Sequence, residues 1–198
     1  LIPGARISEH EVARRLNVSR QPVREAFIRL ADLKLIEIRP QRVTIVRRFS
    51  VQEIRTARFV RQSVEFEVLR LAVARRNAGD ISSMRQNLKQ QAKAVDQKNV
   101  QQFHALDYQF HQLFCRAAGV AYIHDTITEL KSKVDRLCVL GFQDGSTIAE
   151  LIEDHTDMFH ALDQRDEDDM IRAARHHLGR MDAIISRLRM THADYFDD

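Results

Sequence analysis

The sequence has few of the residues that interrupt helices or cross-link chains. Its 198 residues include six glycines, three prolines, two cysteines and no tryptophan. So few glycines and prolines favour long helices joined by short turns. The two cysteines, Cys115 and Cys138, lack a C-x-x-C or zinc-knuckle spacing. They therefore argue against a disulfide framework and indicate thiols in a reducing compartment.

Long apolar runs are also missing. No stretch approaches the roughly 18–20 apolar residues that a membrane-spanning helix needs, and no segment resembles a secretory signal. Hydrophobic residues make up 44% of the chain and charged residues 30%, which is typical of a globular protein with a core of its own. We therefore expect a cytoplasmic protein without a membrane partner.

The charge is unevenly distributed along the chain. Residues 1–49 contain eleven Arg and Lys against five Asp and Glu, whereas the remaining residues contain 20 against 23. A basic segment joined to a mildly acidic one indicates that the first part meets a polyanion and the second does not. Of the nine histidines, only His10 lies in the basic segment.

The basic segment has the pattern of two short helices. Ser8 and Glu11 have the spacing of a capping box, which predicts a helix over about residues 8–16. "NVS" then predicts a tight turn, and Ser19 is expected to cap a second helix that extends to about residue 33. The buried stripe of this second helix is predicted to consist of Val23, Ala26, Phe27 and Leu30.

A small hairpin is predicted after the second helix. Two short β-rich runs, 35–38 and 43–46, flank the basic tip "RPQR". Helix, turn, helix and hairpin together indicate a winged helix-turn-helix, a DNA-binding fold, over residues 1–48. The alternative is a basic helical hairpin that packs on the rest of the protein.

The second helix carries side chains suited to reading base pairs. In this fold its N-terminal residues enter the major groove, where Arg can bind guanine and Gln can bind adenine through two hydrogen bonds. Arg20, Gln21 and Arg24 are predicted to face outward for this contact. Arg42, at the tip of the hairpin, is placed to reach the minor groove or the DNA backbone.

The stretch "VSRQPVREA" resembles the DNA-binding domain of the GntR superfamily of bacterial transcription regulators. The similarity covers about the first 47 residues. Asn17 and Lys34 replace glycines of the family pattern, and Val43 stands where the wing usually has glycine. A helix usually precedes "PG" in the family, so we expect that residues precede Leu1 in the complete protein. The resemblance implies operator contacts by Arg6, Ser19, Arg20, Gln21 and Arg24.

From Ser50 onward the sequence has a helical pattern. Ser50 and Glu53 form another capping box, and the breaks fall at "NAGD", "KN", "AGV", "GFQDGS" and "QRD". We therefore expect a mainly α protein, in which an all-helical bundle over residues 49–190 follows the winged helix-turn-helix and 191–198 form a tail. The predicted helices are 50–78, 80–97, 99–118, 120–142, 147–164 and 166–190.

One aspartate and three histidines are predicted to point inward from three of these helices. Asp107 and His111 lie at i, i+4 beside an apolar stripe, His155 falls within the stripe of its helix, and His177 borders another. Burying one such group without a partner costs several kcal/mol, and a shared divalent cation would explain all four. Imidazole and carboxylate ligands suit zinc, our first expectation, or nickel, manganese or iron.

Two alternatives to this ligand set are open. Each histidine could instead be an ordinary core residue with a hydrogen-bond partner. His104 and His124 lie near the same helix faces and could replace a member of the set.

Residues from about 50 to 190 resemble the all-helical FCD effector domain of the FadR subfamily within GntR. The resemblance rests on "DYQFH", "EDHTDMF" and "RHHL", and it implies that Asp107, His111, His155 and His177 bind a metal. "RQSVE" matches a motif of the first helix of this domain, so Arg61 is expected to anchor the carboxylate of a ligand. The alternative role for Arg61 is a salt bridge to Glu65.

Together these patterns predict a transcription regulator, in the first place a repressor, and not an enzyme. A small carboxylate or sugar acid bound at the metal site would control it. One recognition helix covers only a few base pairs, so we expect a homodimer on a palindromic operator of double-stranded DNA. Two alternatives are a regulator whose metal is purely structural and a helical metallohydrolase. The hydrolase would lack a general base beside the ligands.

Overall fold

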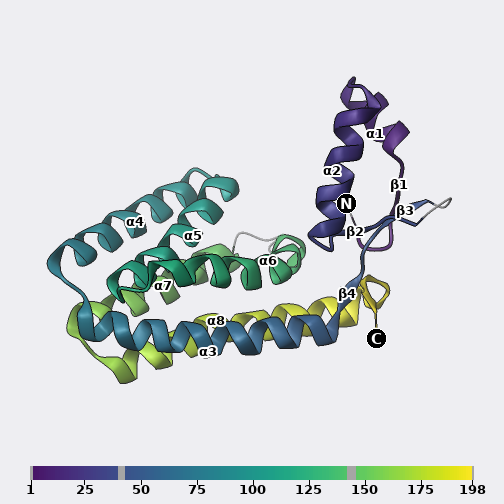
Figure 1. Cartoon of the computed structure of the whole chain (residues 1–198). Helices are drawn as coiled ribbons and strands as arrows, with labels where there is room; N and C mark the ends of the chain where they lie inside the picture. Colours follow the sequence, from purple (N-terminus) through teal and green to yellow (C-terminus); the bar gives the residue numbers. More distant parts are fainter. Residues whose placement is uncertain (1, 40–42, 142–145, 198) are drawn as a thin grey trace. The chain divides into compact units, whose positions relative to one another are not determined.

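The protein forms two compact units, which a computed structural model describes for residues 2–39, 43–141 and 146–197. The first unit comprises Leu1–Ile54 and Arg187–Asp198, and the second comprises Arg55–Ser186. Helices dominate the chain, which confirms the prediction of a mainly α fold (Figure 1). The elements are β1 (Arg6–Ile7), α1 (Glu9–Leu16), α2 (Arg20–Asp32), β2 (Ile36–Glu37), β3 (Thr44–Val46), β4 (Phe49–Ser50), α3 (Val51–Arg75), α4 (Ala78–Asp96), α5 (Val100–Ala117), η1 (Ala121–Ile123), α6 (His124–Gly141), α7 (Ser146–Gln164), α8 (Glu167–Thr191), η2 (Ala193–Tyr195) and β5 (Phe196–Asp197).

A three-stranded antiparallel sheet accompanies the two helices of the first unit. β3 lies between β1 and β2, with Arg6 opposite Ile45 and Ile36 opposite Val46. β2 and β3 are the two sides of the predicted hairpin, whose tip residue Arg42 lies outside the described residues. β1 is absent from the sequence prediction because two residues are too few to show an alternating pattern.

The helix-turn-helix follows its predicted boundaries closely. Ser8 caps α1 by accepting a hydrogen bond from the Glu11 amide at 3.5 Å. Ser19 stands at the N-cap position of α2, but its hydroxyl makes no capping hydrogen bond. The prediction that Ala26 is buried is wrong. Positions i, i+4, i+7 and i+8 share one helix face, and the residues on that face are Val23, Phe27, Leu30 and Ala31.

Two residues of the first unit occupy the left-handed backbone region at the positions where the resemblance expects glycine. Asn17 has a φ of 54° and closes α1, and Lys34 has a φ of 57°. The amides of Lys34 and Leu35 donate to the carbonyls of Ala31 and Leu30 at 2.8 and 2.9 Å, which is the Schellman pattern at the end of α2. The backbone at residue 34 therefore has the conformation for which glycine is best suited.

Lys34→Gly is expected to stabilise the protein. Relief of the left-handed strain should exceed the entropy that glycine adds to the unfolded chain, giving a net gain of about 0.5–1 kcal/mol in the free energy of unfolding. Urea unfolding followed by circular dichroism measures this change. Arg29→Gly, on the exposed side of α2, is the control and should cost about 1 kcal/mol. Equal destabilisation by both substitutions would contradict the prediction.

The second unit is a helical bundle around an aromatic and aliphatic core. α3 and α8 lie side by side (Figure 1), joined by the guanidinium of Arg58 and the carboxylate of Asp182, with Nη2 and Oδ2 2.7 Å apart. α4 packs against α5 and α7. The largest side chains buried in the bundle include Phe103, Phe110, Phe114, Leu69, Met84, Met158 and Leu162.

The break between α3 and α4 lies slightly earlier than predicted. The Asn77 side chain accepts hydrogen bonds from the amides of Gly79 and Asp80, and the Asp80 carboxylate accepts one from the Asn77 amide. This capping box begins α4 at Ala78 rather than at residue 80. None of the helices in the described residues is both long enough and apolar enough to cross a membrane.

The last residues, expected to form a tail, are ordered within the first unit. β5 pairs in parallel with β4, with Phe49 opposite Phe196 and Ser50 opposite Asp197. The two phenylalanine rings are 5.5 Å apart, and both side chains are buried. The pairing joins residues 49–50 to residues 196–197, which are far apart in the sequence, and no local pattern indicates it.

Candidate metal centre and DNA-reading helix

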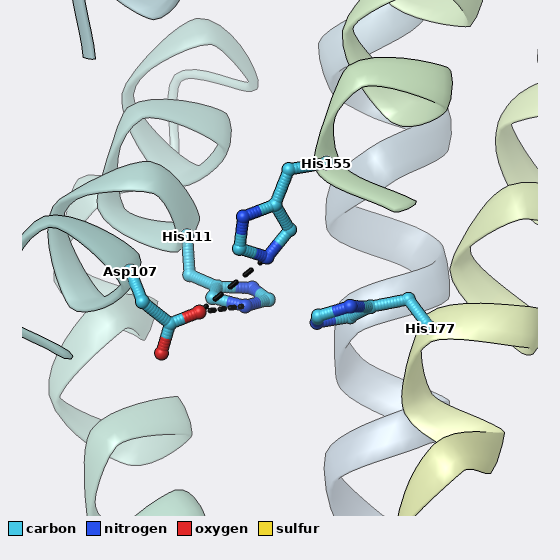
Figure 2. Close-up of side chains that lie close together, drawn as sticks. All are labelled: Asp107, His111, His155 and His177. Carbon is cyan, nitrogen blue, oxygen red and sulfur yellow. Dashed lines mark ion pairs between the residues drawn. The ribbon is translucent and has the colours of Figure 1, made fainter. Parts of the chain in front are cut away.

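Four side chains from three helices converge inside the second unit (Figure 2). α5 supplies Asp107 and His111, which lie one helical turn apart. α7 supplies His155 and α8 supplies His177. All four are buried, and one potential ligand atom from each lies within 4.8 Å of the others. These are the four residues that the sequence predicts, and neither His104 nor His124 belongs to the group.

The convergence leaves buried ring nitrogens without hydrogen bonds. Nε2 of His155 and Nε2 of His111 lie 3.4 and 3.7 Å from Oδ1 of Asp107. These two atoms have no hydrogen-bond partner among the described residues. Nδ1 of His177 also has none, but its nearest carboxylate is Asp154 and not Asp107. An unpaired buried polar atom costs about 1–3 kcal/mol. Ligands of one zinc ion, each about 2 Å from the metal, lie roughly 3–3.5 Å apart, so the arrangement fits a shared cation.

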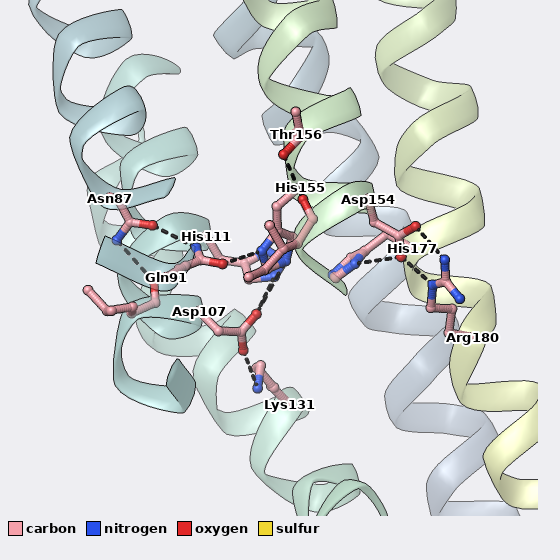
Figure 3. Close-up of polar contacts among 12 residues, drawn as sticks. Asn87, Gln91, Asp107, His111, Lys131, Asp154, His155, Thr156, His177 and Arg180 are labelled. Carbon is pink, nitrogen blue, oxygen red and sulfur yellow. Dashed lines mark hydrogen bonds and ion pairs between the residues drawn. The ribbon is translucent and has the colours of Figure 1, made fainter. Parts of the chain in front are cut away.

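An acceptor from another helix lies beside a ring nitrogen of each histidine, and Figure 3 shows those of His155 and His177, which are Gln91 and Asp154. Nδ1 of His111 is 3.0 Å from Oε2 of Glu65 on α3, and Nδ1 of His155 is 2.8 Å from Oε1 of Gln91 on α4. Nδ1 of His177 is 3.6 Å from Oδ2 of Asp154, slightly beyond hydrogen-bond length. We call Glu65, Gln91 and Asp154 the outer acceptors. Such partners orient metal-binding histidines and favour a lone pair on the opposite nitrogen.

The second oxygen of Asp107 belongs to a buried ion pair. Nζ of Lys131 on α6 lies 3.0 Å from Oδ2 of Asp107 and 3.0 Å from Oδ1 of Asp135. Burial would raise the pKa of Asp107, but the neighbouring Lys131 ammonium outweighs burial and lowers it. Burial would lower the pKa of Lys131, but Asp107 and Asp135 outweigh it and raise it. Asp107 is therefore ionised, with Oδ1 directed at the histidines.

Burial keeps two of the histidines neutral. It lowers the pKa of His155 well below its usual value, and the neighbouring His177 adds to the effect. Burial also lowers the pKa of His177, although Asp154 opposes it. A neutral imidazole has the free lone pair that a metal ion requires.

Two outer acceptors are themselves held by arginines. Nε of Arg61 donates a short hydrogen bond to Oε1 of Glu65, so the salt bridge that the sequence left open is present. Arg180 binds both oxygens of Asp154, with Nη2 2.8 Å from Oδ1. Burial would raise the pKa of Asp154, but the neighbouring His177 and the hydrogen-bonded Arg180 lower it to about 2. Both carboxylates are thus charged beside their histidines.

Sequence reasoning missed Gln91, Asp154 and Lys131. Lys131 and Asp135 are four residues apart on α6, which is also the spacing of an ordinary surface ion pair. Gln91 lies in the polar stretch "NLKQQ", and the residues on either side of Gln91 are exposed. Asp154 directly precedes the candidate ligand His155 in the sequence, and this position was the only local signal for it.

The predicted DNA-reading side chains lie on the surface of the first unit. Arg20, Gln21 and Arg24 are exposed on the N-terminal turns of α2. Ser19, which directly precedes α2, and Arg6 on β1 are also exposed. The Arg20 side chain retains 69% of its accessible surface and is 4.0 Å from Glu9. Gln21 donates to Glu25 at 3.0 Å. In this fold the N-terminal end of the second helix enters the major groove. Long side chains that can donate hydrogen bonds are therefore available at that end of α2.

Two family models match the two parts of the chain. The model described as bacterial regulatory proteins, gntR family, matches residues 1–46, and that of the FCD domain matches residues 57–180. The chain belongs to the GntR family. As a GntR-family protein with an FCD domain it is a DNA-binding transcription regulator and not an enzyme, which excludes the metallohydrolase. The matched FCD region contains all four residues of the metal centre.

Relatives and solved structures agree with this assignment. The GntR-family chain is 40% identical over 198 residues to the HTH-type transcriptional repressor RspR of Escherichia coli (strain K12), covering 100% of this chain and 87% of RspR. It is 26% identical over 165 residues to the gluconate operon transcriptional repressor of Bacillus licheniformis, covering 82% and 65%. The structure of E. coli McbR/YncC has the same fold, with a TM-score of 0.73 at 20% identity and coverage of 94% and 89%.

Proposed function

We propose that this GntR-family regulator is a repressor whose FCD domain binds a divalent metal ion through Asp107, His111, His155 and His177. The observation that supports the proposal is the convergence of buried, unpaired ring nitrogens on one ionised carboxylate oxygen. Zinc suits three imidazoles and a carboxylate, and nickel, manganese or iron are the alternatives. The bound ion would supply a Lewis-acidic point with open positions for oxygen ligands.

We further propose that a small carboxylate or sugar acid binds at this metal. One carboxylate and three neutral imidazoles carry a single negative charge against the two positive charges of the ion, so the loaded centre attracts an anion. The buried guanidinium of Arg61 connects to His111 through Glu65 on α3. Arg61 is therefore our choice for the residue that anchors the carboxylate. The printed name of the B. licheniformis relative, a gluconate operon repressor, is compatible with a sugar acid.

The first unit would bind a palindromic operator as part of a homodimer in the cytoplasm. Arg20, Gln21 and Arg24 would contact base edges, and Arg6, Ser19 and Arg42 would contact the DNA beside them. Ser19 is suited to a phosphate contact because its hydroxyl is exposed and makes no capping bond. The name of RspR, a transcriptional repressor, supports repression rather than activation.

Acids should stabilise the regulator only when its metal centre is loaded. A thermal-shift screen of carboxylic and sugar acids, D-gluconate included, is expected to raise Tm for the zinc-loaded protein and not for the chelator-treated protein. Arg61→Lys removes the planar guanidinium, which can donate two hydrogen bonds to one carboxylate. It should lower the affinity for the acid that binds best by about tenfold. Arg70→Lys, on a more exposed part of α3, is the control.

If the metal is purely structural, the same screen should give the opposite result: no acid should raise Tm. If zinc raises Tm but no acid raises it further, the metal holds the bundle together and the effector part of the proposal fails.

A further inference from the structure

Two buried amides on α4 have no role in the ligand set proposed above. Asn87 and Gln91 lie four residues apart, and only 5% and 0% of their surfaces are exposed. Buried amides are unfavourable unless all of their polar atoms are paired. Their position beside the metal centre therefore calls for an account of where their hydrogen bonds go.

The two amides form a continuous chain of hydrogen bonds from α5 to α7 (Figure 3). Nδ2 of Asn87 donates to the backbone carbonyl of Leu106 at 3.1 Å. Nε2 of Gln91 donates to Oδ1 of Asn87 at 2.7 Å. Oε1 of Gln91 lies 2.8 Å from Nδ1 of His155. We call this chain the amide relay.

The direction of the amide relay follows from its first member. A backbone carbonyl can only accept, so Asn87 must turn its NH₂ group toward Leu106 and its oxygen toward Gln91. Gln91 must then turn its own NH₂ group toward Asn87 and its oxygen toward His155. Reversing either amide would place two acceptors or two donors against each other in the core, which is costly.

We infer that Asn87 and Gln91 are positioning residues that hold the proton of His155 on Nδ1 and its lone pair on Nε2. Nε2 is the nitrogen that lies 3.4 Å from Oδ1 of Asp107 and has no hydrogen bond among the described residues. Leu106 directly precedes Asp107 in α5, so one turn of that helix supplies a ligand and also orients a second ligand on α7. The inference rests on the proposed metal site for its effect on metal affinity, but not for the tautomer.

The amide relay differs from the other two outer acceptors in its charge. Glu65 and Asp154 are carboxylates, and each is paired with an arginine. His155 is the most deeply buried of the three histidines, with no exposed surface. An uncompensated carboxylate beside it would carry a large desolvation penalty. A neutral amide, whose orientation is set by a backbone carbonyl, supplies the acceptor without that charge.

Gln91→Leu tests the inference, with Gln90→Leu on the exposed side of α4 as the matched control. Nitrogen-15 NMR of the histidine rings in the metal-free protein should show His155 protonated on Nδ1 in the wild type and in Gln90→Leu. In Gln91→Leu we expect a tautomer mixture, and a zinc dissociation constant, measured by chelator competition, that is about 10- to 100-fold higher. An unchanged tautomer with zinc affinity equal to that of the control would overturn the inference.

Two further variants separate orientation from packing. Gln91→Glu retains an acceptor for Nδ1 of His155. It should keep the tautomer and a zinc affinity within about threefold of the wild type, but it should lower the stability of the fold because the new carboxylate is buried. Loss of zinc binding equal to that of Gln91→Leu would overturn the proposed role. Asn87→Leu removes the acceptor for Nε2 of Gln91, so Gln91 can turn either end of its amide toward His155 and a tautomer mixture is expected. This variant tests the relay if Gln91→Leu does not fold. A wild-type protein that binds no zinc would refute the metal site, whereas the tautomer would still decide the relay.

Discussion

His155→Ala is expected to abolish the thermal stabilisation that zinc gives to the intact regulator. At a free zinc concentration of 100 times the dissociation constant, binding to the folded state adds about 2.7 kcal/mol of stability. For a chain of this size that gain corresponds to a rise of roughly 5–10 °C in Tm. His155 has no exposed surface, and its Nε2 faces Asp107 without a hydrogen bond. Without this donor, three ligands remain and the affinity should fall steeply. Circular dichroism melts with zinc and with a chelator measure the shift.

His160→Ala is the matched control for this prediction. His160 lies on the same helix, α7, but its side chain is exposed and it is not a member of the metal centre. The control should keep the full zinc shift. Each variant is compared with itself with and without zinc, so a loss of packing in the core does not affect the comparison. An undiminished shift in His155→Ala would show that this histidine is not a ligand.

Arg24→Ala should weaken binding to the operator while leaving the fold intact. Arg24 is exposed near the N-terminus of α2, and the guanidinium can bind guanine through two hydrogen bonds. Loss of such a contact costs about 1–3 kcal/mol, or roughly 5- to 150-fold in affinity. The operator can be selected from a pool of randomised duplexes, and fluorescence anisotropy then measures affinity for the operator and for unrelated DNA. The loss should be confined to the operator, and Arg20→Ala should behave in the same way.

Arg29→Ala separates base reading from general attraction to DNA. Arg29 is also exposed, but it lies in the last turn of α2. Any phosphate contact that it makes would weaken operator and unrelated DNA alike and reduce the salt dependence of binding. If Arg24→Ala leaves the ratio of operator to unrelated affinity unchanged, α2 does not read the sequence through this residue.

The sequence alone was sufficient to predict those features that depend on residues close together in the chain. The capping distance from Ser8 to Glu11 and the turn at "NVS" located α1 and α2 to within about a residue. The inward position of Asp107, His111, His155 and His177 was also predicted from the sequence, because helical periodicity shows which polar side chains border an apolar stripe. Their burial and mutual approach agree with that expectation. The identity of the potential ligands was therefore readable before any helix was packed.

Only the tertiary structure decided what surrounds these ligands. Gln90 and Gln91 are adjacent and identical in sequence, yet one is exposed and the other orients His155, because α4 packs with one side against α5 and α7. Lys131 and Asp135 have the spacing of an ordinary surface ion pair, but Lys131 is buried because it also contacts Asp107 on α5. β5, at residues 196–197, pairs with β4, at residues 49–50, which is distant in the sequence. Each of these contacts depends on which helix faces or strands meet, and no spacing along one helix contains that information.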